Sequence, residues 1–320
     1  PDSCMNEFCN ELSNHKNITN LVAANEGSAV SLGIGYHLAT SKIPCIYMQN
    51  SGLGNATDPL TNLISKTLYN LPMILLIGWR GAPSIKDEAQ HDIQGRVLLD
   101  SLKLFEIKSA ILEKDKDLLK AEKLINYSKK NSARIALIFK PKTLSKVNHS
   151  HKKNKNKISR IDFISELIKN ISKKTKIISS VGFNSRELFY LRKKEKIFNG
   201  KDFLMVGAMG HTAMTALSMT KFSKSNIICL DGDGSFIMHM GALSMLKNFK
   251  AKNFKYILVD NEAHESIGMQ PIFINKIDFK NLSKSLGFKN FYLIKEKKDI
   301  KIKISSFLRS QGPSFLHVKV

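Results

Sequence analysis

The sequence predicts an α/β fold made of two doubly wound parallel-sheet domains. Three observations lead to this prediction: short apolar runs alternate with helix-like stretches, a polar lysine-rich stretch interrupts the alternation, and 320 residues suffice for about two domains. Strands separated by helices favour parallel sheets covered by helical layers. We therefore expect one domain at residues 1–140, an exposed linker at 141–160 and a second domain at 161–320.

Periodicity and length define the expected elements in each half. Apolar runs of strand length occur, in chain order, at Pro44–Met48, Met73–Ile77, Arg134–Phe139, Lys176–Val181, Phe203–Val206, Asn226–Leu230, Phe254–Val259, Phe291–Ile294 and Ser314–Val318. Stretches with helical spacing occur at Glu26–Thr40, Asp117–Lys130, Ile161–Ser172, Ser185–Arg192, Thr212–Lys221, Phe236–Phe249 and Lys298–Arg309. The polar, glycine-rich stretch Tyr47–Leu63 is expected to be largely a loop after a strand.

Composition narrows the class of protein. The net charge of +23 has three interpretations, which we rank as compositional bias, steering of anionic substrates and, third, nucleic-acid binding. The lysines are scattered among Asn and Ile residues without a stacking motif, so we expect no nucleic-acid partner. No apolar run approaches a membrane span, and four cysteines without metal spacing predict reduced, buried thiols and a cytoplasmic location.

Polar residues follow two neighbouring predicted strands in the C-terminal half. The segment Gly232–Ser235 (GDGS) ends one strand, and Asn261 follows the next. Open α/β sheets bind ligands at the carboxyl ends of their strands, so Asp233, Asn261 and the carbonyl of Ala263 could hold Mg²⁺. The candidate contacts to phosphate oxygens are Gly232, Gly234 and Ser235. Considered alone, the GDG segment is better explained as an ordinary turn.

The spacing of these residues resembles the GDG-x(24–27)-N motif of thiamine diphosphate (ThDP) enzymes, because 26 residues, 235 to 260, separate Gly234 from Asn261. The motif usually ends in Asn-Asn, whereas here it ends in Asp-Asn. By resemblance, "VGAMGHT" at 206–212 implies that Gly207 and Gly210 contact the cofactor and that Met209 is the apolar wedge beneath its bent form. The alternative for Met209 is core packing.

The N-terminal half offers an acid, Glu26, at the start of a helix of small residues, "AANEGSAVSLGIGYHLA". Alone, it would be a helix N-terminal acid that interacts favourably with the dipole. The pattern resembles the segment carrying the catalytic glutamate of ThDP decarboxylases, which bonds to the aminopyrimidine ring. The resemblance implies pyrimidine-binding and diphosphate-binding domains that meet across subunits, and hence a homodimer or homotetramer.

Further stretches resemble phosphonopyruvate decarboxylases: "PDS" at 1–3, "QNSGLGN" at 49–55, "GWRG" at 78–81, "DEAQH" at 87–91 and "NEAHESIGMQP" at 261–271. Sulfopyruvate decarboxylases, which share the "QNSGLGN" stretch, are the alternative. The resemblance implies that a small anionic 2-oxoacid, 3-phosphonopyruvate, is converted to phosphonoacetaldehyde and CO₂. Glu262 stands where the family has glycine. The family also has a strand before "PDS", so we expect a segment upstream of Pro1.

Four side chains are candidates for transferring protons or binding the phosphonate group. His91, His264 and Asp2 could transfer protons, although the histidines could only orient loops and Asp2 could only cap a helix. Arg80 has a fork that matches phosphonate oxygens, but it could equally form a surface ion pair. The remaining candidates for the substrate pocket are Asn50, Ser51, Asn55 and Gln270.

Overall fold

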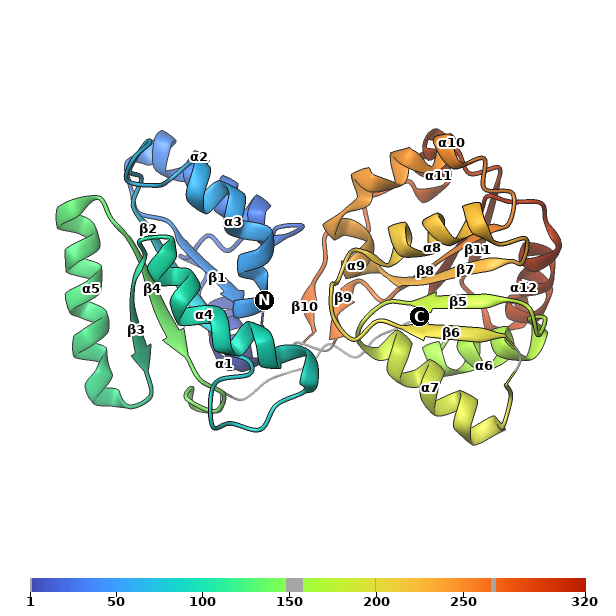
Figure 1. Ribbon diagram of the computed structural model, residues 1–320, viewed down its shortest axis with the longest axis horizontal. Helices are drawn as coiled ribbons and strands as arrows, with labels where there is room; N and C mark the ends of the chain where they lie inside the picture. The colour runs from blue at the N-terminus through green and yellow to red at the C-terminus, as the bar shows by residue number, and fades with distance from the viewer. Residues whose placement is uncertain (1, 148–157, 199, 266–268) are drawn as a thin grey trace. The chain divides into compact units, whose positions relative to one another are not determined.

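The structure, a computed structural model, describes residues 2–147, 158–198, 200–265 and 269–320. The chain divides into two compact units, Pro1–Ser150 and His151–Val320 (Figure 1). Pro1 of the "PDS" stretch, residues 148–157 of the predicted linker and residues 266–268 of the "AHESIGMQP" stretch lie outside the described residues. Ile158 is buried, so the linker prediction is wrong at its C-terminal end.

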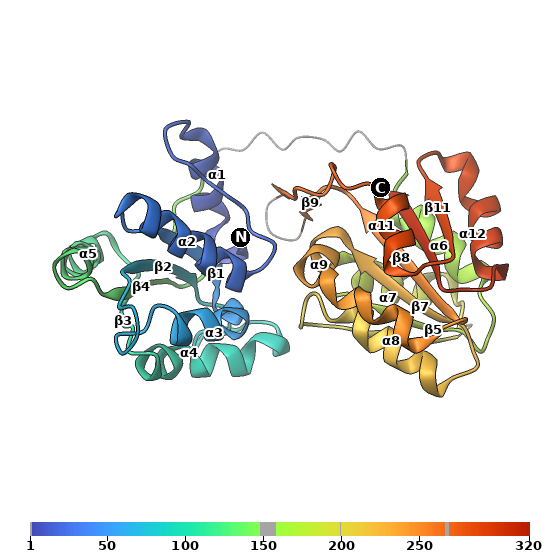
Figure 2. The same cartoon turned by 90° about the horizontal axis from the view of Figure 1, so that it is seen from above.

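The first unit contains a four-stranded parallel sheet in the order β1-β2-β4-β3. Its strands are β1 (Cys45–Gln49), β2 (Met73–Gly78), β3 (Lys108–Leu112) and β4 (Arg134–Phe139). Its helices are α1 (Asn6–Asn14), α2 (Glu26–Thr40), α3 (Leu53–Asn62), α4 (Asp92–Leu104) and α5 (Leu118–Asn131). Helices α2, α3 and α4 share one apolar core with the sheet, and α1 and α5 share another. Helix α5 lies beside β3 and β4 in both views (Figures 1 and 2).

The second unit contains a six-stranded parallel sheet in the order β11-β12-β8-β7-β5-β6. Its strands are β5 (Lys176–Ser179), β6 (Lys201–Leu204), β7 (Ile227–Gly232), β8 (Phe254–Asp260), β11 (Asn290–Ile294) and β12 (Ser314–Lys319). One core joins the sheet to α6 (Arg160–Asn170), α7 (Phe183–Glu195) and α12 (Ile300–Arg309). A second core joins it to α8 (Thr212–Phe222), α9 (Asp233–Met238), α10 (Leu246–Phe249) and α11 (Phe279–Leu286). A short antiparallel pair, β9 (Ala263–His264) and β10 (Gln270–Pro271), follows β8.

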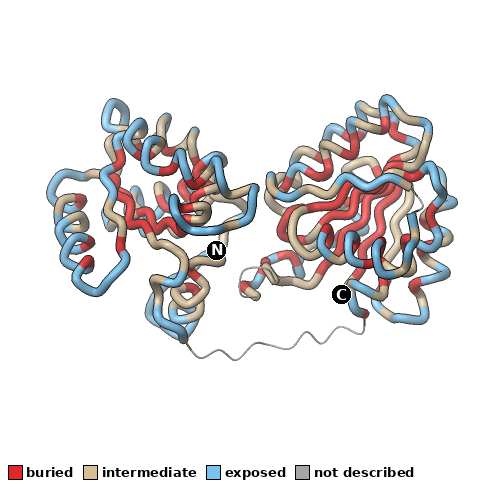
Figure 3. Tube along the Cα trace, turned by 60° about the horizontal axis from the view of Figure 1, so that its bottom comes forward, coloured by how far each residue is buried: buried red, intermediate tan, exposed pale blue. Residues whose placement is uncertain are grey.

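Burial explains why the apolar runs form these strands. All seven residues of β8 are buried, as expected for a parallel strand covered by helices on both faces. Figure 3 shows buried segments gathered in the middle of each unit. Even Lys255 in this strand is fully buried, and its ammonium group donates to the carbonyl of Phe307 at 2.7 Å. The predicted fold class is therefore confirmed. Among the described residues, no helix combines the length and the apolar character needed to cross a bilayer.

The order of the strands locates a ligand-binding position in the second unit. The chain runs from β5 outward to β6 and then returns to β7, on the other side of β5. The strand order therefore reverses between β5 and β7. In open parallel sheets, the carboxyl ends of the strands at such a reversal form a crevice where ligands bind.

Several local predictions are wrong. The stretch Tyr47–Leu63 continues from β1 into a 3₁₀ turn, Asn50–Gly52, and then α3, because Leu53, Ala56 and Leu60 form a buried stripe at helical spacing. The predicted helix Phe236–Phe249 instead begins at Asp233 and is interrupted after Met238. Cys45 is exposed rather than buried, although all four cysteines are free. The elements that the sequence did not predict are α1, α3, α4, α11, β3, β9 and β10.

Candidate active site

The GDG segment lies at the crevice between β5 and β7. Asp233 begins α9 directly after β7, and its side chain is buried. One carboxylate oxygen accepts from the N–H of Gly234 at 2.7 Å, and the other accepts from the N–H of Asn261 at 3.1 Å. Burial, with a further contribution from the charge of Asp260, raises the pKa of Asp233 to about 7. A cation beside this carboxylate would stabilise its charged form.

The loop after β8 brings amide and carbonyl oxygens to the same place. Asn261 donates from Nδ2 to Glu265 at 3.1 Å, while its Oδ1 accepts from the N–H of Ala263 at 3.3 Å. Ala263 pairs in β9 with Pro271, which has no N–H to offer to its carbonyl. Glu262 has φ +59°, a left-handed conformation that favours glycine, which accounts for the glycine expected there by resemblance.

Close contacts around the glycines form a cradle. A Cβ atom on Gly234 would lie 2.8 Å from both Met209 Cε and His264 Cε1. Gly210 has φ +92°, and its N–H donates to Ser235 Oγ at 3.0 Å. A side chain at Gly210 would also overlap the ring of His239, at 2.4 Å. The structure therefore brings the segment at 207–210, where Gly207 precedes Ala208 at φ +53°, against the GDG segment.

A cavity at the carboxyl ends of β5, β7 and β8 joins these residues. Its lining includes Ser180, Gly182, Asn184, Met209, Gly232, Asp233, Ser235, Asn261, Ala263 and His264. The sequence did not predict Asn184. It is buried, its Nδ2 lies 3.1 Å from Ser180 Oγ, and its Oδ1 has no hydrogen-bond partner in the described part of the chain.

These residues fit a diphosphate and a hard cation. The carboxylate of Asp233, Oδ1 of Asn261 and the carbonyl of Ala263 are the oxygen ligands that Mg²⁺ takes, and the glycine cradle leaves room for phosphate oxygens. Across the described residues, no group of three or more His, Cys, Asp or Glu side chains is arranged to hold a metal. The candidate metal site therefore depends on its amide and carbonyl oxygens.

Two further predicted residues lie on the β9–β10 pair. His264 is half-buried beside Gly234, and burial lowers its pKa to about 4, so its ring is neutral at pH 7. Gln270 pairs with His264 across the hairpin, but its side chain is only 4% exposed. The candidate proton-transfer residue therefore lines the cavity, whereas the candidate substrate contact is buried.

Glu26 lies in the first unit, at the first position of α2. Asn25 caps this helix by accepting from the N–H of Ser28 at 2.8 Å. The carboxylate of Glu26 accepts from Asn55 Nδ2 at 2.8 Å. A Cβ atom on Gly52 would lie 2.5 Å from Glu26 Cγ, so the 3₁₀ turn packs directly on this side chain. Asn55, a candidate for the substrate pocket, holds the carboxylate of Glu26, and its contact with substrate stays a prediction.

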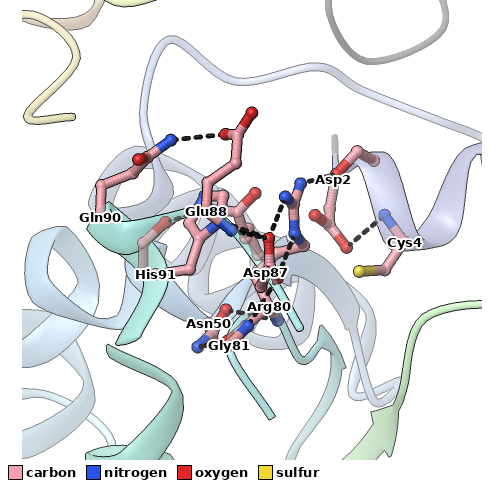
Figure 4. Close-up of polar contacts among 12 residues, drawn as sticks. Asp2, Cys4, Asn50, Arg80, Gly81, Asp87, Glu88, Gln90 and His91 are labelled. Atoms are coloured by element: carbon pink, nitrogen blue, oxygen red, sulfur yellow. Dashed lines mark hydrogen bonds and ion pairs between the residues drawn. The ribbon is translucent and has the colours of Figure 1, made fainter. Parts of the chain in front are cut away.

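Arg80 and His91 come together through Asp87, which the sequence did not predict (Figure 4). Arg80 donates from Nε to Asp87 Oδ2 at 2.8 Å and from Nη1 to Ser3 Oγ at 2.6 Å. His91 Nδ1 lies 2.9 Å from Asp87 Oδ1. Arg80 therefore forms an ion pair with Asp87, and its contact with the phosphonate stays a prediction.

Two residues of the "QNSGLGN" stretch shape the adjoining turn. Asn50 is buried, donates to the carbonyl of Arg80 at 2.9 Å and accepts from the N–H of Arg80 at 3.0 Å. Ser51 accepts from Gln49 Nε2 at 2.6 Å. Asn50 therefore joins the carboxyl ends of β1 and β2, as in the interpretation that gave it a role in the turn.

Asp2 is buried and caps the first turn of the chain. Its Oδ2 accepts from the N–H of Cys4 at 3.1 Å, and its Oδ1 has no hydrogen-bond partner within the described ranges. Burial raises its pKa to about 6. The capping interpretation therefore has a direct contact, and the raised pKa also leaves Asp2 able to exchange a proton near neutrality.

The sequence also missed Arg160. Its guanidinium donates to Glu187 of α7 at 3.0 Å and to Glu265 of the Asn261 loop at 2.6 Å. Arg160 lies within the stretch interpreted as a linker, and 105 positions separate it from Glu265. No sequence pattern predicts a contact over that distance, whereas Asp87 and His91 share a spacing of four residues that can indicate one.

Comparison with known proteins identifies the family. The family model described as "Thiamine pyrophosphate enzyme, N-terminal TPP binding domain" matches residues 1–104, and its C-terminal counterpart matches residues 180–318. A phosphonopyruvate decarboxylase from Streptomyces hygroscopicus is 25% identical over 100% of this chain and 82% of its own length. A sulfopyruvate decarboxylase from Methanosarcina acetivorans is 26% identical over 95% of this chain and 84% of its own length.

A further relative covers only part of the chain. The alpha subunit of sulfopyruvate decarboxylase from Methanocaldococcus jannaschii is 36% identical over 39% of this chain and 72% of its own length. Both ThDP-binding domains are therefore matched, and the similar proteins act on 2-oxoacids. The chain belongs to the family of thiamine diphosphate-dependent decarboxylases.

Proposed function

We propose that this enzyme converts 3-phosphonopyruvate to phosphonoacetaldehyde and CO₂, with ThDP and Mg²⁺ as cofactors. The observation that carries the proposal is the alignment of the whole chain with a phosphonopyruvate decarboxylase. The cavity supports the cofactor part of the proposal, because Asp233 and Asn261 are hydrogen-bonded there beside the glycine cradle.

Residues of both units would hold the cofactor. Asp233, Asn261 and the carbonyl of Ala263 would bind Mg²⁺, and the cradle around Gly234 would accommodate the diphosphate. Met209 would support the bent cofactor, and Glu26 would bond to the aminopyrimidine. When bound, ThDP supplies an electron sink for the carbanion that remains after CO₂ leaves. By resemblance to ThDP decarboxylases, each site would combine Glu26 of one copy with Asp233 of another, so the active enzyme would be at least a homodimer.

Two histidines are candidates for proton transfer. Burial lowers the pKa of His264 and favours its neutral ring, in which one nitrogen donates and the other accepts a hydrogen bond beside the cavity. His91 would exchange a proton through the ring nitrogen that does not face Asp87. The cytoplasmic location expected from the sequence stays a prediction.

Sulfopyruvate is the second candidate substrate, because a sulfopyruvate decarboxylase also aligns with nearly the whole chain. Sulfonate and phosphonate groups have similar size and differ in charge. We favour phosphonopyruvate because the stretches "GWRG" and "DEAQH" resemble the phosphonopyruvate enzymes.

Release of CO₂ from the two acids, measured side by side, tests the proposal. With ThDP and Mg²⁺ present, kcat/KM should be higher for phosphonopyruvate than for sulfopyruvate, and release should stop when ThDP is omitted. Faster turnover of sulfopyruvate would overturn the proposal that phosphonopyruvate is the substrate. Equal release of CO₂ with and without ThDP would overturn the proposal that ThDP is the cofactor.

A further inference from the structure

Five polar contacts converge on the carboxylate of Asp87. Its Oδ1 lies 2.9 Å from His91 Nδ1 and accepts from the N–H of Glu88 at 2.7 Å and from Arg80 Nη2. Its Oδ2 accepts from Arg80 Nε at 2.8 Å and from the N–H of Gly81 at 2.7 Å. The side chain is only 9% exposed, and its partners, labelled in Figure 4, all belong to residues 80–91, which follow β2.

This environment fixes the protonation state of Asp87. Hydrogen bonds from Arg80 hold the pKa of this carboxyl well below its usual range, and the N–H of Gly81 and the ring of His91 act in the same direction. An ionised carboxylate only accepts hydrogen bonds. The ring nitrogen of His91 that faces it must therefore carry a hydrogen, which leaves Nε2 without one whenever the ring is neutral.

We propose that Asp87 is a positioning residue that holds neutral His91 in the Nδ1–H tautomer and fixes the fork of Arg80. The Nε2 atom of His91 is then the proton acceptor, in the same orientation at each turnover. The part of this inference that concerns turnover rests on the proposed function. The part that concerns the tautomer depends only on the contacts of the described residues.

An asparagine at position 87 would separate this role from simple support of the loop. Asn has one acceptor end and one donor end, whereas Arg80 and the backbone N–H groups of Gly81 and Glu88, which between them face both ends, can only donate. Two of these donors lose their acceptor whichever way the amide turns, but only on the side of His91 can the N–H₂ find an acceptor, because the ring can move its hydrogen to Nε2 and accept at Nδ1. The Asp87→Asn variant should therefore turn its N–H₂ toward His91 and reverse the tautomer.

The chain contains its own reporter of the loop and a matched control. Trp79, the only tryptophan, precedes Arg80 and donates from Nε1 to the carbonyl of Gly95 at 2.8 Å, so its emission reports whether the loop is intact. Asp92, next to His91, forms an exposed pair with Arg96 at 2.8 Å. Asp92→Asn is therefore the same chemical change at a neighbouring site without the five contacts.

Nitrogen NMR of ¹⁵N-histidine-labelled protein without cofactor tests the tautomer, with His91→Gln used to assign the signals. At a pH where the ring is neutral, the unsubstituted protein, Asp92→Asn and Arg80→Gln should all show Nδ1–H, whereas Asp87→Asn should show mainly Nε2–H. An Nε2–H ring in the unsubstituted protein would overturn the proposal without any variant. An unchanged tautomer in Asp87→Asn with normal Trp79 emission would also overturn it.

Turnover of the full enzyme with ThDP and Mg²⁺ tests the consequence. Asp87→Asn should lower kcat by about 10²-fold or more, within the usual contribution of a positioned acid or base. Asp92→Asn should leave it unchanged. A reversed tautomer with normal kcat would remove His91 from proton transfer. If the unsubstituted enzyme fails to release CO₂ from phosphonopyruvate, the proposed function fails, while the NMR result still decides the tautomer.

Discussion

At the scale of single residues, Asp233 combines burial with a position at the end of a strand. Its carboxylate receives two backbone N–H groups, yet burial and the charge of Asp260 disfavour the ionised form. An ionised carboxylate in this environment destabilises the folded state when no cation is bound, and a bound cation offsets that cost. It therefore links the stability of this unit to the bound metal.

Asp233→Asn should remove the stabilisation by the cofactor. For the unsubstituted protein, ThDP and Mg²⁺ at 100 times the dissociation constant should add about 2.7 kcal/mol to the free energy of unfolding. In the variant this increase should vanish, while the cofactor-free midpoint stays equal or rises because a buried charge is gone. Thermal unfolding with and without cofactors measures both effects. Asp58→Asn, at an exposed acid, is the control, and a variant that keeps the full increase would contradict the metal site.

The raised pKa of Asp2 predicts that the free energy of unfolding falls as the pH rises. Burial raises its pKa from 3.8 to about 6, so between these values the folded chain keeps a proton that the unfolded chain has lost. The contribution of Asp2 to the free energy of unfolding is complete below pH 3.8 and is lost as the pH rises through about 6. The change amounts to roughly 3 kcal/mol. Asn can still cap the turn, so Asp2→Asn should lack this loss. Urea unfolding of both proteins from pH 3.8 to 6 measures this difference in the free energy of unfolding. If the free energies of the two proteins change in parallel with pH, the assignment to Asp2 is contradicted.

The sequence predicts some of these residues and not others, for a physical reason. Asp233 and Asn261 follow adjacent parallel strands, so the period of the strands alone brings their backbones together. Asp87, Arg160 and Asn184 make contacts that depend on the path of a loop or on the packing of two helices. Arg80 shows the limit clearly, because its residue type suits a phosphonate and an ion pair equally well.

At the scale of elements, apolar runs predicted most strands because both faces of the two sheets are covered. Strand β3 was missed because it begins with Lys108 and Ser109, which are exposed, and lies at the edge of the sheet, where only Leu112 is buried. Helix α3 was missed because Gly54 and Pro59 are typical of loops, although its buried stripe has helical spacing. The composition of this segment predicts a loop and the spacing of its apolar residues predicts a helix. The segment is helical because those apolar residues are buried against the rest of the unit.

The ion pairs of Arg160 connect two elements, α6 and α7, to the loop that carries Asn261. Asn261 donates to the same oxygen of Glu265 that Arg160 holds. The orientation of this amide therefore depends on a guanidinium from α6, which is itself half-buried.

Arg160→Met should weaken Mg²⁺ binding at saturating ThDP by about 1–2 kcal/mol, which is a 5- to 30-fold rise in the dissociation constant. The reason is that Glu265 loses its cation and no longer fixes Asn261. Thermal unfolding over a series of Mg²⁺ concentrations measures it. Lys297→Met, which breaks an exposed pair with Asp162 of the same helix, should change little. An equal effect of both substitutions would contradict the role of Arg160.

At the scale of the whole molecule, the two units supply different parts of one proposed site. The first carries Glu26, held by Asn55, and the second carries Asp233 and Asn261. The sequence predicts both units from their own strands and helices. It contains no equivalent signal for assembly, because contacts between copies depend on surfaces rather than on periodicity.

The most direct test of the central claim, that Glu26 and Asp233 of different copies serve one ThDP, is to mix two inactive variants. Glu26→Gln and Asp233→Ala, unfolded and refolded together, should form mixed dimers in which one of the two sites has both acids intact. Random pairing makes about half of the dimers mixed, so CO₂ release should recover to about a quarter of the unsubstituted activity. Mixed dimers that form and release no CO₂ would contradict the claim.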